Sequence, residues 1–195
     1  MAVYEYARHG ESTANVRRVV AGHSDVELTA LGLRQAHEAG DRAWAGNREY
    51  DRIISSPLVR AYITASVIAE KTGYDAGEIE LHAGLKEKGA GRFELQPIES
   101  FYGMSDDELA AGGAETARMF RDRVVGAARD IYERTQHLDR VLIVAHAGIY
   151  KIAQATIGNH APTYMYKIKS PPNAEIMPYP MEEMVNFDTD NDTRA

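Results

Sequence analysis

The chain has 195 residues, of which 44% are hydrophobic and 26% charged, with a net charge of -7 and a pI near 5.5. This acidic balance argues against nonspecific nucleic-acid binding, which needs a basic face, and no apolar run approaches the roughly 18 residues that cross a bilayer. We expect no secretory signal, because the N-terminus goes straight into a strand. The absence of cysteine excludes disulfides and thiolate chemistry and fits a cytoplasmic enzyme.

The first two predicted elements are a strand and a helix. Residues 3–7 alternate and contain Val and two Tyr, which favours a partly buried strand. Thr29 is placed to cap a helix. The inner face of that helix is expected to carry four residues at helical spacing: Leu33, Ala36, Gly40 and Ala43.

A second strand and helix follow. Residues 51–55 predict a short buried strand, after which Ser56 is expected as N-cap and Pro57 as the first helical position. Gly73 is placed to end this helix, and residues 78–82 predict a third strand. The helix is expected to bury a stripe made of Leu58, Ala61, Ala65 and Ile68.

The middle of the chain changes character. Residues 83–113 are rich in glycine and predict a long irregular region, a feature that is usually functional or mobile. A helix is expected from Glu115 to about Thr135. Its apolar face would consist of Phe120, Val124, Ala127 and Ile131.

The last third begins with the clearest strand. Residues 141–145 form a continuous apolar run of the kind that parallel sheets bury, and a helix is expected from there to about Ile157. Residues 163–168 and 182–187 are interpreted as late strands, and the polar stretch 188–195 as a frayed tail. The alternation predicts one domain, a three-layer α/β/α sandwich with a mostly parallel central sheet.

Two histidines follow the two clearest strands, in Arg8-His9-Gly10 and Ala145-His146-Ala147-Gly148. Parallel strands deliver their C-terminal residues to one edge of a sheet, so we expect His9 and His146 to share a crevice. Arg60 falls in the first turn of a helix, where the macrodipole disfavours a cation by up to about 1 kcal/mol unless an anion binds nearby. Each residue alone is equally compatible with a structural histidine or a solvated arginine, and the combination favours an anion site.

Six segments in order resemble motifs of the histidine phosphatase superfamily, the phosphoglycerate-mutase-like proteins. Together they cover most of residues 3–175, and the ordered set is far more specific than the RHG triplet alone. The segments are ARHGESTAN (7–15), AGHSDVELTALGLRQA (21–36), SSPLVRAYITA (55–65), LKEKGAGRFE (85–94), GGAETARMFRDRV (112–124) and VAHAGI (144–149).

The resemblance implies phosphoryl transfer through a phosphohistidine, without a metal or other cofactor. His9 would be the nucleophile, presenting one neutral ring nitrogen while an acceptor holds the hydrogen of the other. Arg8 and Arg60 would favour the neutral ring and donate to the phosphate oxygens. Glu87 matches the general acid, which protonates the leaving oxygen and then assists the attack of water.

Three further groups would donate to the phosphate: the ring of His146, the backbone N–H of Ala147 at a helix start, and the side chain of Asn15. Glu11 is expected to brace an arginine or a backbone amide, and His23 to line the pocket mouth. No HExxH or comparable spacing occurs, so we predict no metal site.

The substrate is expected to be a small phosphorylated metabolite, with neither nucleic acid nor a membrane as partner. Residues 88–113 leave little room for the insertion that encloses the substrate in longer, cofactor-dependent mutases, which favours a phosphatase over a phosphoglycerate mutase. A non-catalytic binder of phosphorylated ligands is the third alternative. Lys86, Lys88 and Arg92 would add positive charge for a second acidic group. The chain could also form a homodimer.

Overall fold

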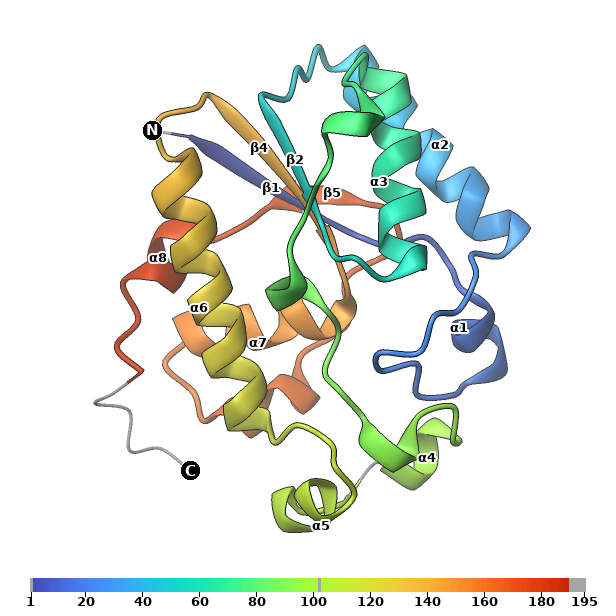
Figure 1. Ribbon diagram of the computed structural model, residues 1–195, viewed down its shortest axis with the longest axis vertical. Coiled ribbons are helices and arrows are strands. Elements are labelled where there is room, and N and C mark those ends of the chain that lie inside the picture. Colours follow the sequence, from blue (N-terminus) through green and yellow to red (C-terminus); the bar gives the residue numbers. More distant parts are fainter. Residues whose placement is uncertain (1, 102, 190–195) are drawn as a thin grey trace.

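The computed structural model describes residues 2–101 and 103–189, and these build a five-stranded sheet between two layers of helices (Figure 1). The strand order is β3-β2-β4-β1-β5, with all neighbours parallel except β5, which runs antiparallel to β1. The strands are β1 (Val3–Arg8), β2 (Arg52–Ser55), β3 (Glu80–Leu81), β4 (Arg140–Ala145) and β5 (Ile176–Pro178). The predicted mostly parallel sandwich is therefore confirmed.

The helices divide between the two faces of the sheet. Helices α2 and α3 cover one face, and α6, α7 and α8 cover the other (Figure 1). The helices are α1 (Thr13–Arg17), α2 (Ala30–Ala45), α3 (Val59–Thr72), α4 (Ile98–Phe101), α5 (Asp106–Ala111), α6 (Ala117–Thr135), α7 (Ala147–Ile157) and α8 (Met181–Val185). The irregular 83–113 region thus contains two short helices, α4 and α5, and the predicted long helix α6 follows it.

The central strand β4 shows why its sequence is apolar throughout. Val141, Ile143 and Ala145 pack into the core under α6 and α7, whereas Leu142 and Val144 point the other way, into the core under α2 and α3. A strand with helices on both faces has no solvent side, so the usual polar alternation disappears. Each buried branched side chain contributes about 1.5–3 kcal/mol to the free energy of unfolding.

The register of the three central strands places their last residues together. Arg8 pairs with Ala145, and the backbone N–H of His9 donates to the Ala145 carbonyl oxygen at 2.9 Å. On the other side of β4, the backbone N–H of Ser56 donates to the Val144 carbonyl oxygen at 3.0 Å. The segments that follow β1, β2 and β4 therefore begin side by side at one edge of the sheet.

Both predicted late strands are wrong. Residues 163–168 lie mostly in a 3-10 helix, Pro162–Lys167, whose Pro162 and Met165 are buried three positions apart as that helix requires. Residues 182–187 lie mostly in α8, where Met181 and Met184 pack into the core at helical spacing. Tertiary packing overrides the β-propensity of Tyr, Ile and Val here. The actual last strand, β5, has three residues and ends in Pro178, which an edge strand tolerates.

Two details of the predicted helices also change. Leu33 is 41% exposed rather than buried, because α2 turns Gly32 inward, where a Cβ would meet the Glu11 carbonyl oxygen at 2.0 Å. The other three residues of the predicted stripe, Ala36, Gly40 and Ala43, are buried as predicted. Helix α3 begins at Val59 with Leu58 as N-cap, so Ser56 and Pro57 precede the helix instead of starting it. The cap at Thr29 is confirmed, since its hydroxyl accepts from the N–H of Gly32 at 3.0 Å.

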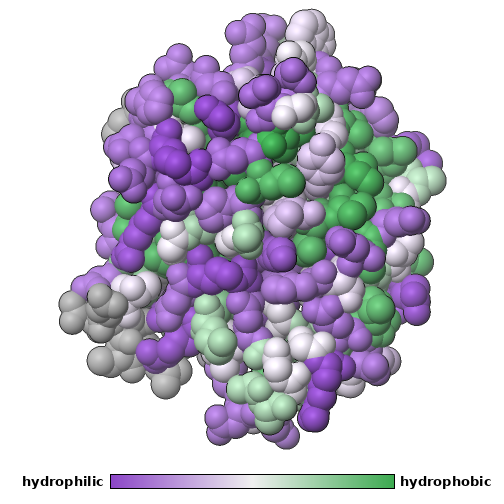
Figure 2. All heavy atoms as spheres, in the orientation of Figure 1, coloured by the Kyte–Doolittle hydropathy of each residue, from purple (hydrophilic) through white to green (hydrophobic). Residues whose placement is uncertain are grey.

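The surface mixes polar and apolar side chains. Figure 2 shows apolar residues scattered over the side that α2 and α3 form, and Leu31, Trp44 and Tyr62 are among the exposed large side chains there. A homodimer remains a prediction. Within the described ranges, no helix is long and apolar enough to cross a membrane. Of the predicted frayed tail 188–195, residues 190–195 lie outside the described residues.

Candidate active site

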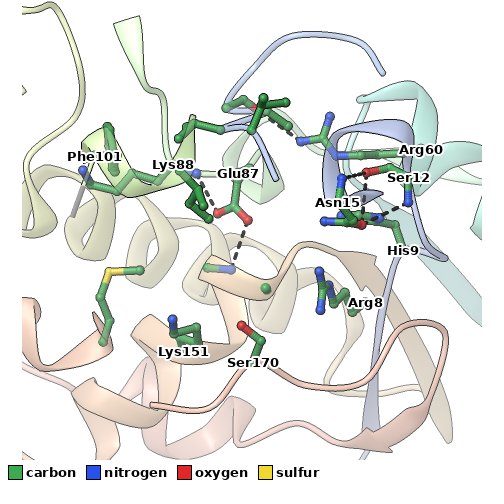
Figure 3. A pocket seen from close by; sticks show the side chains of 18 of the residues that line it. Arg8, His9, Ser12, Asn15, Arg60, Glu87, Lys88, Phe101, Lys151 and Ser170 are labelled. Carbon is green, nitrogen blue, oxygen red and sulfur yellow. Dashed lines mark hydrogen bonds between the residues drawn. The ribbon is translucent and has the colours of Figure 1, made fainter. Parts of the chain in front are cut away.

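A cavity of about 220 Å³ opens at the edge of the sheet where β1, β2 and β4 end (Figure 3). Its walls come from the segments that follow β1, β2, β3 and β4, from α4 and from the 3-10 helix Pro162–Lys167. The polar or charged side chains that line it are Arg8, His9, Ser12, Asn15, Arg60, Glu87, Lys88, Lys151, Tyr166 and Ser170. With one exception, every residue expected at the phosphate lines this cavity. The exception is His146.

His9 is held with one ring nitrogen occupied. The side chain is 4% exposed, and its Nδ1 lies 2.7 Å from the carbonyl oxygen of Gly10. The backbone of Gly10 is fixed in turn, since its N–H donates to the Thr64 hydroxyl at 3.1 Å. A neutral ring with its hydrogen on Nδ1 leaves Nε2 as a free nucleophilic lone pair.

His146 lies behind His9 rather than in the cavity wall. The two ring centroids are 5.3 Å apart, and His146 is fully buried. Its Nε2 lies 2.7 Å from the hydroxyl oxygen of Ser56, while its buried Nδ1 has no hydrogen-bond partner among the described residues. Ser56, expected only as a helix cap, is therefore the residue that orients the second histidine.

Burial and neighbouring cations keep both histidines neutral. Burial lowers the pKa of His9 well below its ordinary value of 6.5, and the charges of Arg60 and Arg8 lower it further. Burial likewise lowers the pKa of His146 well below 6.5, with Arg60 and His9 adding to the effect. The rings therefore remain unprotonated at neutral pH, as a nucleophile requires.

These shifts predict a stability change in acid. Below about pH 6.5 the unfolded chain binds protons on both histidines that the folded chain does not, so the free energy of unfolding falls as pH falls, by up to about 1.4 kcal/mol per pH unit for each histidine. Urea unfolding of the wild type and of His9→Gln across this range checks the prediction. The variant should lose less stability per pH unit, because it lacks the titration of His9. The carboxylates titrate equally in both proteins and do not affect the comparison. Equal slopes would show that His9 does not titrate this way.

Hydrogen bonds from the guanidinium groups to backbone carbonyl oxygens anchor the two arginines. Arg60 is 1% exposed, and its guanidinium donates to the carbonyl oxygens of Ser24 and Gly22, both at 2.9 Å. Arg8 donates from Nη1 to the carbonyl oxygen of Pro171 at 3.0 Å, and its buried Nε has no partner. Neither arginine forms an ion pair within the described residues, so both retain positive charge for an anion.

Glu87 lies at the N-terminus of α7. Its carboxylate accepts from the backbone N–H of Gly148 at 3.1 Å and from that of Lys88 at 2.8 Å. The approach is close enough that a Cβ at position 148 would meet Oε1 at 2.0 Å, which explains the glycine. The main chain of Glu87 is fixed by Arg123, which donates to its carbonyl oxygen at 3.0 Å and pairs with Glu115 at 2.6 Å.

Asn15 presents its amide nitrogen to the cavity. Its Oδ1 accepts from the backbone N–H and the hydroxyl of Ser12, both at 3.0 Å, within the capping box of α1. The NH₂ group is thus the part of the side chain left for a ligand. Ala147 is the first residue of α7 and also lines the cavity.

Several neighbouring residues differ from expectation. Glu11 accepts from the Thr29 hydroxyl at 2.8 Å, and within the described residues its carboxylate contacts neither an arginine nor a backbone amide. His23 is not in the cavity wall; its Nε2 lies 2.9 Å from the Glu87 carbonyl oxygen. Lys86 and Arg92 also lie outside the wall, whereas Lys88 is part of it.

Sequence reasoning missed Lys151. This lysine stands four positions after Ala147 on α7, so both face the cavity. Helical spacing counted from the His146 motif would have found it. No group of three or more His, Asp or Glu side chains that could hold a metal ion occurs in the part of the chain that the structure describes.

Comparisons with known proteins agree with this geometry. The sequence model of the histidine phosphatase superfamily (branch 1) matches residues 6–184. An uncharacterized phosphatase, PhoE of Bacillus subtilis, is 32% identical over 139 residues, which cover 71% of this chain and 68% of the relative. A probable phosphoglycerate mutase, GpmB of Salmonella choleraesuis, is 34% identical over 151 residues, which cover 71% of this chain and 66% of the relative. This chain thus spans about two thirds of the length of the curated relatives it matches.

Among solved structures, a phosphoserine phosphatase from Entamoeba histolytica, in complex with 3-phosphoglyceric acid, superimposes with a TM-score of 0.73 and 27% identity. That match covers 90% of this chain and 89% of the other. The family match extends across nearly all of the sheet and all three strand ends that build the cavity. This chain is therefore a member of the histidine phosphatase superfamily.

Proposed function

We propose that this chain is a metal-independent phosphomonoesterase that hydrolyses a small phosphorylated metabolite through a phosphohistidine on His9. The observation that carries the proposal is the placement of a neutral, buried His9 beside two arginines that form no ion pair with any described residue, at the end of a cavity that also contains Glu87. The volume of about 220 Å³ is below the range of about 300–1,000 Å³ typical of drug-sized ligands, which favours a small ester.

In the first step, Nε2 of His9 attacks phosphorus as the bond to the ester oxygen breaks. The phosphoryl oxygens would be held by Arg8, Arg60 and the amide of Asn15, which stabilise the charge that spreads over them. A Ser56 hydroxyl that donates to Nε2 of His146 would select the tautomer of that ring with its hydrogen on Nδ1. Preorganised donors of this kind commonly supply the largest part of catalysis.

The carboxyl of Glu87 would protonate the departing alcohol oxygen. In the second step the Glu87 carboxylate would take a proton from water, whose oxygen attacks the phosphohistidine. The P–N bond breaks, inorganic phosphate is released, and the neutral histidine and the protonated acid are restored. The hydrogen bonds from Gly148 and Lys88 would fix the carboxyl in place for both steps.

Replacing Glu87 by Gln tests its role through the leaving group. For an alkyl ester such as glycerol 3-phosphate, loss of the acid is expected to lower turnover by about 10²–10⁴-fold. With 4-nitrophenyl phosphate, whose leaving group needs little protonation, the variant should still release a burst of one nitrophenolate per active site and then stall. The matched control is Glu78→Gln, on the 3-10 helix before β3. If the rate of the first step falls equally with both esters, Glu87 is not the general acid.

The alternative is a phosphoglycerate mutase, which the name of the 34% identical relative favours. Phosphorus NMR of 3-phosphoglycerate with a trace of 2,3-bisphosphoglycerate in EDTA distinguishes the two. A phosphatase is expected to release inorganic phosphate, since water attacks the phosphohistidine. The release should continue in EDTA, because no proposed step uses a metal. Formation of 2-phosphoglycerate without release of phosphate would establish the mutase instead.

A further inference from the structure

Lys88 is a buried cation whose ammonium group has no hydrogen-bond partner among the described residues. The residue is 7% exposed. Two aromatic rings contact it instead: Nζ lies 5.1 Å from the centroid of Phe101 and 5.9 Å from that of Tyr166. Burial lowers the pKa of Lys88, and nearby acids, Asp106 foremost, only partly oppose this. Cation–π contacts alone compensate poorly for burying an ammonium group.

A second lysine faces the same space. Lys151 lines the cavity from α7, and no ion pair or hydrogen bond of its side chain occurs within the described ranges. Burial lowers the pKa of Lys151, with Glu87 opposing that shift and Arg8 adding to it. Figure 3 shows Lys88 and Lys151 on the opposite side of the Glu87 carboxylate from His9.

This position is where the alcohol part of a substrate would extend. In a phosphoryl transfer the attacking and leaving atoms are roughly in line, so a leaving oxygen points away from His9, past Glu87 and toward the lysines. The wall there also contains Phe101 and Tyr166, which limit the length of the alcohol. Small leaving groups therefore place their far end close to the lysines.

The charges of the cavity do not balance for a simple ester. Its wall contains four basic side chains, Arg8, Arg60, Lys88 and Lys151, and one acidic side chain, Glu87. A bound phosphate would neutralise the arginines and leave the two lysines with Glu87 alone. A second negative charge on the substrate would compensate these two ammonium groups.

We propose that Lys88 and Lys151 form a second anion site, and that the preferred substrate is a small phosphate ester whose alcohol part carries its own negative charge. The charge is a carboxylate or a second phosphate. This inference rests on the proposed phosphatase reaction. It assigns two residues to substrate selection.

The test compares esters matched in size. The wild type is expected to hydrolyse 3-phosphoglycerate with a kcat/KM at least about tenfold above that for glycerol 3-phosphate, which has CH₂OH in place of the carboxylate. Lys88→Met and Lys151→Met should each lower this ratio by about tenfold or more, as expected for loss of a charged hydrogen bond. Lys86→Met is the matched control, a lysine outside the cavity wall, and should keep the wild-type ratio. Propane-1,3-diol bisphosphate, compared with its monophosphate, shows whether a second phosphate serves as well as a carboxylate.

The outcomes separate this inference from the reaction on which it rests. If 4-nitrophenyl phosphate is hydrolysed but acidic and neutral esters react equally, the second anion site is wrong and the phosphatase stands. The site is also wrong if the ratio survives in both variants; Lys151 is only half-buried, so its variant is expected to fold. If no ester is hydrolysed at all, the proposed phosphatase itself fails, and the second site with it.

Discussion

Replacing His9 by Ala is expected to lower the turnover of every phosphate ester by about 10⁴-fold or more, with no burst of product. The effect is large because His9 is the nucleophile of the first proposed step, and without it the remaining groups can only orient water for a direct attack. The fold should persist, because among the described residues the His9 side chain forms a hydrogen bond only with its neighbour Gly10. Rates measured by product release, with unfolding followed in parallel, check both statements.

A conservative variant sharpens the His9 test. His9→Asn keeps a polar group at the hydrogen-bonding position of Nδ1 but has no nitrogen that can form a phosphoramidate, so it should be as inactive as His9→Ala. Both variants are expected still to bind inorganic phosphate through the arginines. Retention of more than about a hundredth of the wild-type turnover in either variant would contradict covalent catalysis by His9.

Replacing Arg60 by Met is expected to lower kcat/KM by about 10²–10³-fold, the usual loss when a donor to the transition state is removed. Arg60 acts twice in this account, once on the phosphoryl oxygens and once by lowering the pKa of His9. The variant should therefore also show an acidic limb of its pH–rate profile shifted to higher pH, because His9 becomes easier to protonate. A purely structural residue would not produce that shift.

The same substitution should reduce stability. Arg60 donates to the carbonyl oxygens of Gly22 and Ser24, and losing a donor to a buried acceptor costs about 1–3 kcal/mol. Arg60→Lys keeps the positive charge, so it should still lower the pKa of His9. It lacks the planar guanidinium group, so it should lose the hydrogen bonds to Gly22 and Ser24. An unshifted pH profile in Arg60→Met, together with a loss below tenfold, would overturn the assigned role.

The meeting of His9 and His146 could be predicted because it follows from two strong strand signals. Residues 3–7 and 141–145 are unambiguous, and parallel strands end at a common edge. The sequence did not contain the register that pairs Arg8 with Ala145, which is a tertiary property. Ser56 was assigned the wrong role for the same reason: its hydroxyl bonds to His146, 90 positions away, and no local pattern records that contact.

The cavity wall opposite His9 was the least predictable part. The glycine-rich 83–113 region folds against the segment after α1, with the N–H of Val20 donating to the carbonyl oxygen of Gln96 at 2.9 Å and Val19 bridging to Pro97. Such pairing of two irregular segments depends on their mutual packing and leaves no periodic signal. In this arrangement Lys88 lines the cavity, whereas Lys86 and Arg92 do not.

The most direct test of the account is to locate the transferred phosphoryl group. Glu87→Gln is mixed with 4-nitrophenyl phosphate in EDTA, quenched in base, where phosphohistidine is stable, and analysed by intact mass and peptide fragmentation. We expect the protein to gain the mass of one phosphoryl group, in step with the burst of nitrophenolate and carried on His9. A burst without a phosphorylated protein, or a phosphoryl group on any other residue, would contradict the mechanism.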